Sequence, residues 1–431
     1  MAERERFAHL LRRATFGPTA QEVDAAEKAG FAATVEALVA PGGEDPLGLP
    51  ALGPDPFTAI NRNSSREERQ AARKARNEQV QQLTAWWLRR MATAKHQFSE
   101  KLVFFWHGHW ATSVQKVDSA QLMLKQLNTF RTLGRGDFGA LVKAMLRDPA
   151  LIIWLDGQRN TREAPNENLA RELMELFTLG IGGGYTENDV KAAARALTGW
   201  TLERTTGQVR LEPKRFDDAE KTILGRTGRF DADGLADLLV AQPVSPRFLA
   251  SRLWFRFAQG DVVPAEAAQR MVSAYGSGRD VTAMARAMFS DPAFAATRGQ
   301  LVKQPVEWLV GAVRQLEVNA DRQGEVVRAL NALDQVPLRP PSVGGWPSGA
   351  AWLTTFALQT KLRLAQSLAV NASAAVVDRL AAAPEAGRPE ALARLLVVDG
   401  WSEATRKVLA PLKVPHRLLT MGLASPEYMV S

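Results

Sequence analysis

The sequence predicts a mainly α-helical protein with a small β-hairpin or irregular insertion near residues 200–230. Three observations support this fold class. Apolar residues recur at helical spacing along most of the 431 residues, capping residues mark several helix starts, and strands do not alternate with helices as in Rossmann or barrel folds. We expect helical regions at 1–199 and 231–431 on either side of the 200–230 insertion, in one continuous body.

In the first half of the chain, Gly, Pro and capping residues separate the predicted helices. Thr19 and Glu22 form a capping box for a helix that Gly30 ends, and residues 41–56 are too rich in Gly and Pro for regular structure. Ser99 is expected to cap an aromatic helix. Further helices are predicted at 31–39, 64–96, 116–133, 137–147, 166–179 and 187–198.

The pattern changes at residue 200. Residues 200–230 mix Thr, Val, Leu and Ile with Gly and charged residues, which is typical of a hairpin or an irregular segment. Helices resume near Ala232, and residues 337–349 contain two Pro-rich and Gly-rich stretches typical of a loop. Later helices are predicted at 246–258, 264–275, 280–289, 304–318, 322–334, 350–370, 374–382, 388–397, 402–410 and 414–422.

Composition restricts the chemistry. The chain has no cysteine, so disulfides, zinc fingers, iron–sulfur clusters and cysteine nucleophiles are excluded, and any metal must be held by His, Asp, Glu, Asn or backbone oxygen. The formal net charge is +8, and basic residues are densest between 62 and 101. That stretch is either a solvated helix face or a contact for nucleic acid or acidic lipid. With no apolar signal segment at the N-terminus and no apolar span, we expect a cytoplasmic protein.

Several common catalytic motifs are absent from the sequence. It contains no P-loop, no His-Glu-x-x-His and no Gly-x-Ser-x-Gly motif. The glycine-rich stretch 180–184 follows a predicted helix and not a strand, so we interpret it as a helix stop and turn and not as a phosphate-binding loop.

The aromatic stretch 104–110 holds the first candidate site, since His107 and His109 are two of only five histidines. On a continuous helix, side chains two residues apart point in directions about 200° apart and cannot share a ligand. We expect Gly108 to end or kink the helix and to let both imidazoles meet. Neutral imidazole binds zinc, iron, copper or nickel. The alternative is that the two rings make ordinary hydrogen bonds in the core.

The second candidate site lies on the helix predicted at 166–179. Glu172 and Glu175 are three residues apart and share a face, and Glu172 is expected to be half-buried beside Leu173. A half-buried carboxylate requires a partner, a metal or a proton. Such a site suits calcium, magnesium or a mixed His/carboxylate metal, and the alternative is a buried network of salt bridges and caps. The polar residues expected around the two carboxylates are Asp156, Asn160, Asn166, Asn168 and Arg171.

A third candidate group lies in the insertion. Asp217, Asp218 and Lys221 either face one pocket or belong to a solvated turn. Trp200 and Trp346 stand at the edges of predicted loops. Aromatic side chains there either stack on a ligand or cover the core.

Seven stretches of the chain resemble the bacterial family catalogued as domain of unknown function 1800. The resemblance covers nearly the whole chain, implies a helical fold and assigns no activity. The matching stretches are His9–Pro18, Phe105–His109, Asn166–Gly180, Tyr185–Val190, Ala194–Trp200, Gly344–Trp346 and Ser425–Tyr428.

Two further points follow from this resemblance. Genes of the family often lie beside those of domain of unknown function 1501, whose members resemble sulfatases and often carry an export signal, which implies a paired and exported system. Relatives usually have Arg-His-Asp where this chain has Arg215, Phe216 and Asp217. If that His is an obligatory metal ligand in relatives, Phe216 breaks the site here.

We therefore expect a helical enzyme, hydrolytic or oxidative, with a polar centre between segments 104–110, 156–175 and 217–221. A divalent metal would be held by His107, His109, Glu172, Glu175 and Asp156, while Glu172, His107 and Arg171 would act in catalysis. The residues expected to orient these groups or to line the pocket around them are Asn160, Asn166, Asn168, Asp217, Asp218, Lys221 and Trp200. The alternative hypothesis is a non-catalytic helical adaptor for a sulfatase-like partner, which loop Trp residues and the basic 62–101 stretch would contact.

Overall fold

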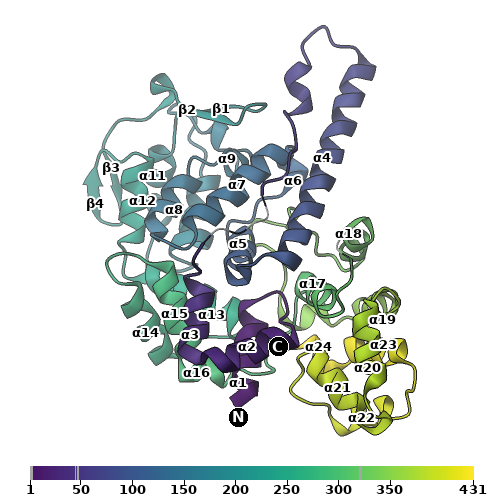
Figure 1. Ribbon diagram of the computed structural model, residues 1–431. Helices are drawn as coiled ribbons and strands as arrows, with labels where there is room; N and C mark the ends of the chain where they lie inside the picture. The colour runs from purple at the N-terminus through teal and green to yellow at the C-terminus, as the bar shows by residue number, and fades with distance from the viewer. Residues whose placement is uncertain (1–2, 44, 46–47, 320–322) are drawn as a thin grey trace.

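The computed structural model describes residues 3–43, 45, 48–319 and 323–431. These ranges form 24 α-helices and two small antiparallel sheets, so the mainly α-helical fold class with a small β insertion is confirmed (Figure 1). Within these ranges, every helix is either too short or too polar to cross a lipid bilayer.

The N-terminal half is built around the aromatic helix α5 (Gln97–His109), which buries almost all of its side chains. In Figure 1 α5 lies near the centre of the molecule, beside the long helix α4. The elements of this half are α1 (Glu3–Ala14), α2 (Ala20–Ala29), α3 (Phe31–Val39), η1 (Pro56–Ala59), α4 (Arg66–Thr93), α6 (Val114–Val117), α7 (Ala120–Leu133), α8 (Phe138–Met145), α9 (Pro149–Trp154), η2 (Gly157–Arg159), α10 (Asn168–Glu172), the π-helix η3 (Leu173–Thr178) and α11 (Glu187–Ala196).

Local capping signals located several of these helices correctly. Thr19 and Glu22 form the expected capping box at the start of α2, which ends before Gly30 as predicted. The helix predicted at 116–133 is instead split, because Asp118 has a left-handed backbone (φ +54°) and α7 starts afresh after it. Ser99 does not cap α5, which already begins at Gln97.

The insertion forms two hairpins, as the composition of 200–230 indicated. In the first, β1 (Trp200–Glu203) pairs with β2 (Gln208–Leu211) and places Trp200 opposite Leu211; the 3-10 turn η4 (Pro213–Arg215) follows. In the second, β3 (Lys221–Ile223) pairs with β4 (Arg226–Gly228). The second hairpin packs on α11, where the backbone N–H of Leu224 donates to Asp189 Oδ1 at 2.7 Å.

Helices make up the rest of the chain. Figure 1 shows α19 to α24 gathered in one cluster beside α17, with α19 packed against α23. The elements are α12 (Ala232–Val240), α13 (Val244–Phe257), α14 (Ala265–Tyr275), α15 (Val281–Ser290), α16 (Pro292–Ala295), α17 (Pro305–Gln315), α18 (Gln323–Ala332), η5 (Gly349–Trp352), α19 (Thr355–Val370), α20 (Ala374–Ala382), η6 (Glu385–Gly387), α21 (Arg388–Leu395), α22 (Glu403–Leu409), α23 (Pro415–Ala424) and α24 (Pro426–Met429).

The segment at residues 9–17 packs against parts of the chain that follow 285 to 387 residues later. His9 Nε2 lies 3.1 Å from the carbonyl oxygen of Phe294, and Arg12 donates two hydrogen bonds of 2.8 and 2.7 Å to Asp399. Gly17 has φ +97°, and a Cβ there would lie only 2.5 Å from the Cα of Gly311. Two backbones therefore cross in direct contact at a position that only glycine fits.

One buried carboxylate joins several of these segments. Glu307 in α17 is only 7% exposed, and its Oε1 lies 2.9 Å from Lys101 Nζ in α5 and 3.1 Å from Arg256 Nη2 in α13. Lys101 also donates to the carbonyl oxygen of Thr15, just after α1. Burial favours a higher pKa for Glu307, but the charges of Arg256 and Lys101 outweigh it and hold the pKa well below its usual range.

Glu307→Gln should destabilise the protein strongly, by about 3–5 kcal/mol, because two buried cations lose their counter-ion. Since the pKa of Glu307 is lower in the folded state, its stabilising effect is complete above the unfolded-state pKa and is lost as the pH falls through the folded-state value. Urea unfolding from neutral to acidic pH would measure both effects.

The matched control is Glu317→Gln, which removes an exposed carboxylate paired with Arg379 at 2.7 Å. Such surface pairs contribute less than about 1 kcal/mol. Equal losses of stability in the two variants would contradict a special role for Glu307.

Candidate functional site

His107 and His109 do not meet, because α5 continues through Gly108 to His109. The backbone N–H of Leu338 donates to His107 Nε2 at 3.1 Å, and the His107 ring lies edge-on to Trp87 and Trp346. His109 Nε2 instead lies 3.0 Å from the carbonyl oxygen of Phe177. The expectation that Gly108 breaks the helix was wrong. One glycine costs a helix only about 1 kcal/mol, which the burial of the surrounding aromatic side chains outweighs.

Both imidazoles are neutral at physiological pH. Burial lowers the pKa of each ring to about 3, with a further contribution at His109 from the charge of Arg252. Because His107 Nε2 accepts a backbone hydrogen bond, its proton is on Nδ1; His109 donates from Nε2, which leaves a lone pair on Nδ1. Each Nδ1 atom is buried without a hydrogen-bond partner among the described residues.

The two carboxylates of the second candidate site, Glu172 and Glu175, lie in α10 and η3. Arg171 pairs with Glu167, Glu175 and Glu187 at 3.0, 3.4 and 2.7 Å, which ties α10 to α11. Glu172 is half-buried as expected, and burial together with the nearby charge of Glu175 raises its pKa. A catalytic role for Glu172 remains a prediction.

The polar residues expected around these carboxylates have other partners. Asp156 has a left-handed backbone and pairs with Lys116 Nζ at 2.8 Å. Asn160 is buried, donates to the carbonyl oxygen of Ala194 at 2.7 Å and accepts from the backbone N–H of Asn166 at 2.9 Å. Asn166 in turn accepts from the backbone N–H of Asn168. These hydrogen bonds order the turn that precedes α10.

The third candidate group is partly brought together in the insertion. Asp217 pairs with Arg195 at 2.7 Å, and this hydrogen bond is the main reason that the pKa of Asp217 is lowered. The buried Lys221 donates to the carbonyl oxygen of Asp217 at 2.6 Å, and its Nζ lies 5.4 Å from the centre of the Phe216 ring. Asp218 is exposed.

Trp200 covers the core: it is 8% exposed, with Arg147 5.4 Å from its ring centre. Across residues 3–43, 45, 48–319 and 323–431, no group of three or more His, Asp or Glu side chains is placed to hold a metal ion. The described part of the chain therefore shows no metal centre of the kind expected from His107, His109, Glu172, Glu175 and Asp156.

A different site lies beside His109. A cavity of about 240 Å³ opens between α5, α13 and the segment 344–348. Its walls carry four aromatic side chains together with basic and polar groups. The lining residues are Phe104, Phe105, Gly108, His109, Arg252, Phe255, Arg256, Gln304, Gly344, Trp346 and Ser348.

Positive charge dominates this cavity. Neither Asp nor Glu occurs among its lining residues, whereas Arg252 and Arg256 both contribute to the wall. Arg256 shares Glu307 with Lys101, as described above. Arg252 has no hydrogen bond or ion pair with any residue in the described ranges, its Nε is buried, and burial lowers its pKa. A desolvated guanidinium without a counter-ion is costly, so the site favours an anion.

The segment 336–348 closes one side of the cavity, and we call it the strap. His107 holds its beginning through the Leu338 bond, and the carbonyl oxygen of Leu338 accepts from the backbone N–H of Val114 at 2.8 Å. Further along, Gly345 has φ +85°, and a Cβ there would lie 2.7 Å from the carbonyl oxygen of Gly108. This close approach brings Trp346 against Phe104, with ring centres 5.8 Å apart.

Sequence reasoning singled out His109 and Trp346 but missed Arg252 and Arg256. These arginines are four residues apart on α13, so they lie on one face of a helix that is otherwise largely apolar. That spacing is a recognisable signal for a buried basic pair. It does not reveal that α5 supplies the opposite wall.

The fold and the cavity define a mainly α-helical protein with a cation-lined and aromatic-walled pocket. The chain belongs to the family described as Protein of unknown function (DUF1800), whose model matches residues 9–430. The resemblance found in the sequence is thus confirmed. Neither the curated proteins nor the solved structures gave a match.

His107→Phe should retain the aromatic packing but leave the buried N–H of Leu338 without an acceptor. We expect a loss of about 1–3 kcal/mol in the free energy of unfolding, measured by urea denaturation. His96→Phe is the control, because His96 precedes α5 and makes no capping hydrogen bond. If His107→Phe is as stable as the wild type, the Leu338 bond does not anchor the strap.

Proposed function

We propose that the protein binds a small organic anion in the cavity beside His109. The observation that carries this proposal is the unpaired guanidinium of Arg252, next to Arg256, in a cavity whose lining has no acidic side chain. Arginine donates paired hydrogen bonds to planar carboxylates and to phosphates. A bound anion would offset the charge that the protein itself leaves uncompensated.

The walls favour a ligand with a flat apolar body. Phe104, Phe105, Phe255 and Trp346 provide aromatic surface around the two arginines. The volume of 240 Å³ equals that of about eight water molecules in the liquid, which limits the ligand to roughly ten non-hydrogen atoms. An aromatic carboxylate or an aryl phosphate has this size, charge and shape.

His109 would be a neutral hydrogen-bonding wall of the site. With its pKa lowered to about 3, it is not a cation at physiological pH, so Arg252 and Arg256 supply the charge. A bound anion near the ring would raise that pKa, because it favours the imidazolium form. The hydrolytic or oxidative metal-dependent reaction considered above lacks a comparable grouping of ligands in the described residues.

Benzoate and phenyl phosphate should bind, whereas benzamide, which has the shape of benzoate but no charge, should bind at least about tenfold more weakly. Titration calorimetry gives the affinities. At ten times Kd, benzoate should stabilise the protein by about 1.4 kcal/mol, or about 1.5 °C in Tm.

Arg252→Gln should reduce benzoate affinity by about tenfold or more. Arg247→Gln is the matched control, because Arg247 is exposed on the same helix. The proposal fails if benzamide and benzoate bind equally, or if both variants bind benzoate as the wild type does.

An adaptor function is the second candidate, and the shape of α4 favours it. In Figure 1 the N-terminal half of α4 projects beyond the body of the molecule with η1 alongside. Its surface is exposed and mixes basic residues such as Arg66, Arg73 and Lys74 with Glu67 and Glu68. A projecting surface that carries both signs of charge suits a complementary protein partner.

For the sulfatase-like partner inferred from the family, the arm gives a direct test. The double variant Arg66→Glu with Arg73→Glu should reduce co-purification of a co-expressed partner severalfold, because the charge pattern of the arm is reversed at two positions. Arg363→Gln, an exposed site on α19, should have no effect. Unchanged recovery with the double variant would exclude the arm as the contact.

A further inference from the structure

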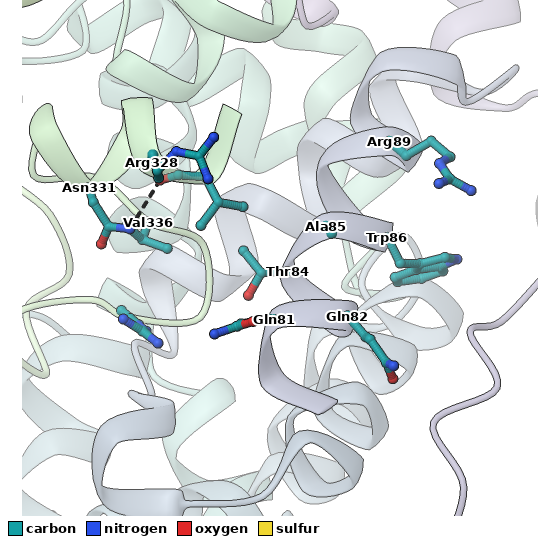
Figure 2. Close-up of a pocket in the computed structure, with 11 residues that line it drawn as sticks. Gln81, Gln82, Thr84, Ala85, Trp86, Arg89, Arg328, Asn331 and Val336 are labelled. Atoms are coloured by element: carbon teal, nitrogen blue, oxygen red, sulfur yellow. Dashed lines mark hydrogen bonds between the residues drawn. The ribbon is translucent and has the colours of Figure 1, made fainter. Parts of the chain in front are cut away.

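The cavities of this protein differ in whether their charged side chains are buried. A cavity of about 740 Å³ between α4 and α18 is bordered by Gln81, Arg328 and Asn331, all of which are exposed (Figure 2). Figure 2 also shows Arg89 on the side of α4 that faces away from Arg328. Exposed guanidinium groups remain hydrated, so this cavity does not require a ligand. A smaller cavity elsewhere has a buried amine in its wall, the side chain of Lys303.

The smaller cavity has a volume of about 150 Å³ and lies where α1 meets residues 397–400 and 427–431. Lys303 stands in its wall just before α17, and the backbone N–H of Lys303 donates to the carbonyl oxygen of Met429 at 2.9 Å. Val302 and Val430 form an isolated antiparallel bridge beside it. The backbone of Lys303 is therefore held in a fixed position at the cavity.

The amine of Lys303 lacks a counter-ion. The residue is only 8% exposed, and no residue in the described ranges forms a hydrogen bond or ion pair with its Nζ, which lies 3.7 Å from the centre of the Tyr428 ring. Burial and then the charge of Arg12 lower the pKa of Lys303 well below its usual range, although the charge of Glu307 opposes them. Full burial changes a lysine pKa more than one aromatic contact does. The amine therefore loses its proton at a lower pH than an ordinary lysine and becomes a nucleophile.

Two carboxylates line the same cavity as Lys303, but neither neutralises it. Asp399 pairs with Arg12 at 2.7 Å, and Glu427 accepts a hydrogen bond of 2.9 Å from the backbone N–H of Ser402. Carboxylates beside a reacting amine are available to carry its protons. The cavity thus combines a buried amine with acidic groups that support its chemistry.

We propose that Lys303 forms an imine with a small uncharged aldehyde that enters this cavity. The lone pair of Nζ attacks the carbonyl carbon, a C–N bond forms, and the oxygen takes the π electrons and one Nζ proton to give a carbinolamine. The hydroxyl then leaves with the second Nζ proton as water, and the C=N bond forms. Nothing is oxidised or reduced in either step.

The surroundings of Lys303 favour this reaction over others of an amine. Amine and imine are both uncharged, which suits a buried position, whereas a carbamate formed with CO₂ would bury a negative charge. Arg12 is already bound by Asp399, so the wall offers no unpaired guanidinium for a carboxylated or phosphorylated aldehyde. The volume equals that of about five water molecules, which limits the aldehyde to roughly five non-hydrogen atoms.

Reductive trapping on the full chain tests the proposal. The protein is incubated at neutral pH with propanal and sodium cyanoborohydride, which reduces an imine to a stable N-propyl amine, and peptide mass spectrometry locates the labelled residues. An ordinary lysine is unprotonated to only roughly 0.04% at neutral pH. We expect Lys303 to be labelled at least about tenfold faster than Lys74, an exposed residue of α4. 2-Naphthaldehyde is too large for the cavity and should leave Lys303 unlabelled.

Two variants and one internal comparison serve as controls. Lys303→Met should lose the fast label, whereas Lys74→Met should keep it. Because Lys303→Met breaks no ion pair, it should unfold at a urea concentration no lower than that of the wild type. Lys361 is also buried, but it donates to the carbonyl oxygen of Trp352 and does not line the cavity, so it should remain unlabelled.

Three results would overturn the proposal. The first is labelling of Lys303 that is no faster than labelling of Lys74 in the wild type. The second is labelling of Lys303 by 2-naphthaldehyde as fast as by propanal, which would show that the amine reacts outside the cavity. The third is a fast label that survives in folded Lys303→Met, which would place the reactive amine elsewhere.

Discussion

The burial of one carboxylate among several cations is the constraint on which the rest of the structure depends. Glu307 joins Lys101 of α5 to Arg256 of α13, and Lys101 in turn binds the end of the first helix. Buried charges require their partners at nearly fixed positions, since an unpaired one is very unfavourable. The network therefore fixes how three distant stretches meet, and the anion cavity lies where they do.

The two histidines of the aromatic helix have distinct structural tasks. His107 accepts a backbone hydrogen bond and positions the strap, while His109 contributes to the wall of the cavity. The π-helix η3 exposes the carbonyl oxygen of Phe177 to His109 and so fixes the orientation and tautomer of that ring. The His-Gly-His sequence suggests a pair of metal ligands, but in the folded protein the two histidines have separate partners.

Features set by neighbouring residues could be predicted from the sequence. The capping box of Thr19 and Glu22 placed α2, and the change of composition at residue 200 placed the hairpins, because both signals act over a few positions. The continuity of α5 through Gly108 could not be predicted, since the tertiary burial of its aromatic residues decides it. The cavity depends on contacts between α5, α13 and the strap, which no local pattern encodes.

The contact between Gly17 and Gly311 has a consequence for the order of biosynthesis. The early residues emerge from the ribosome long before their packing partners at 294, 311 and 399 have been made. Contacts this far apart in sequence require a long loop to close and form late. The nascent chain must therefore leave the face of α1 that meets these partners uncovered until they have been made, although α2 and α5 can pack on α1 earlier, and chaperone protection of that face during translation would be valuable.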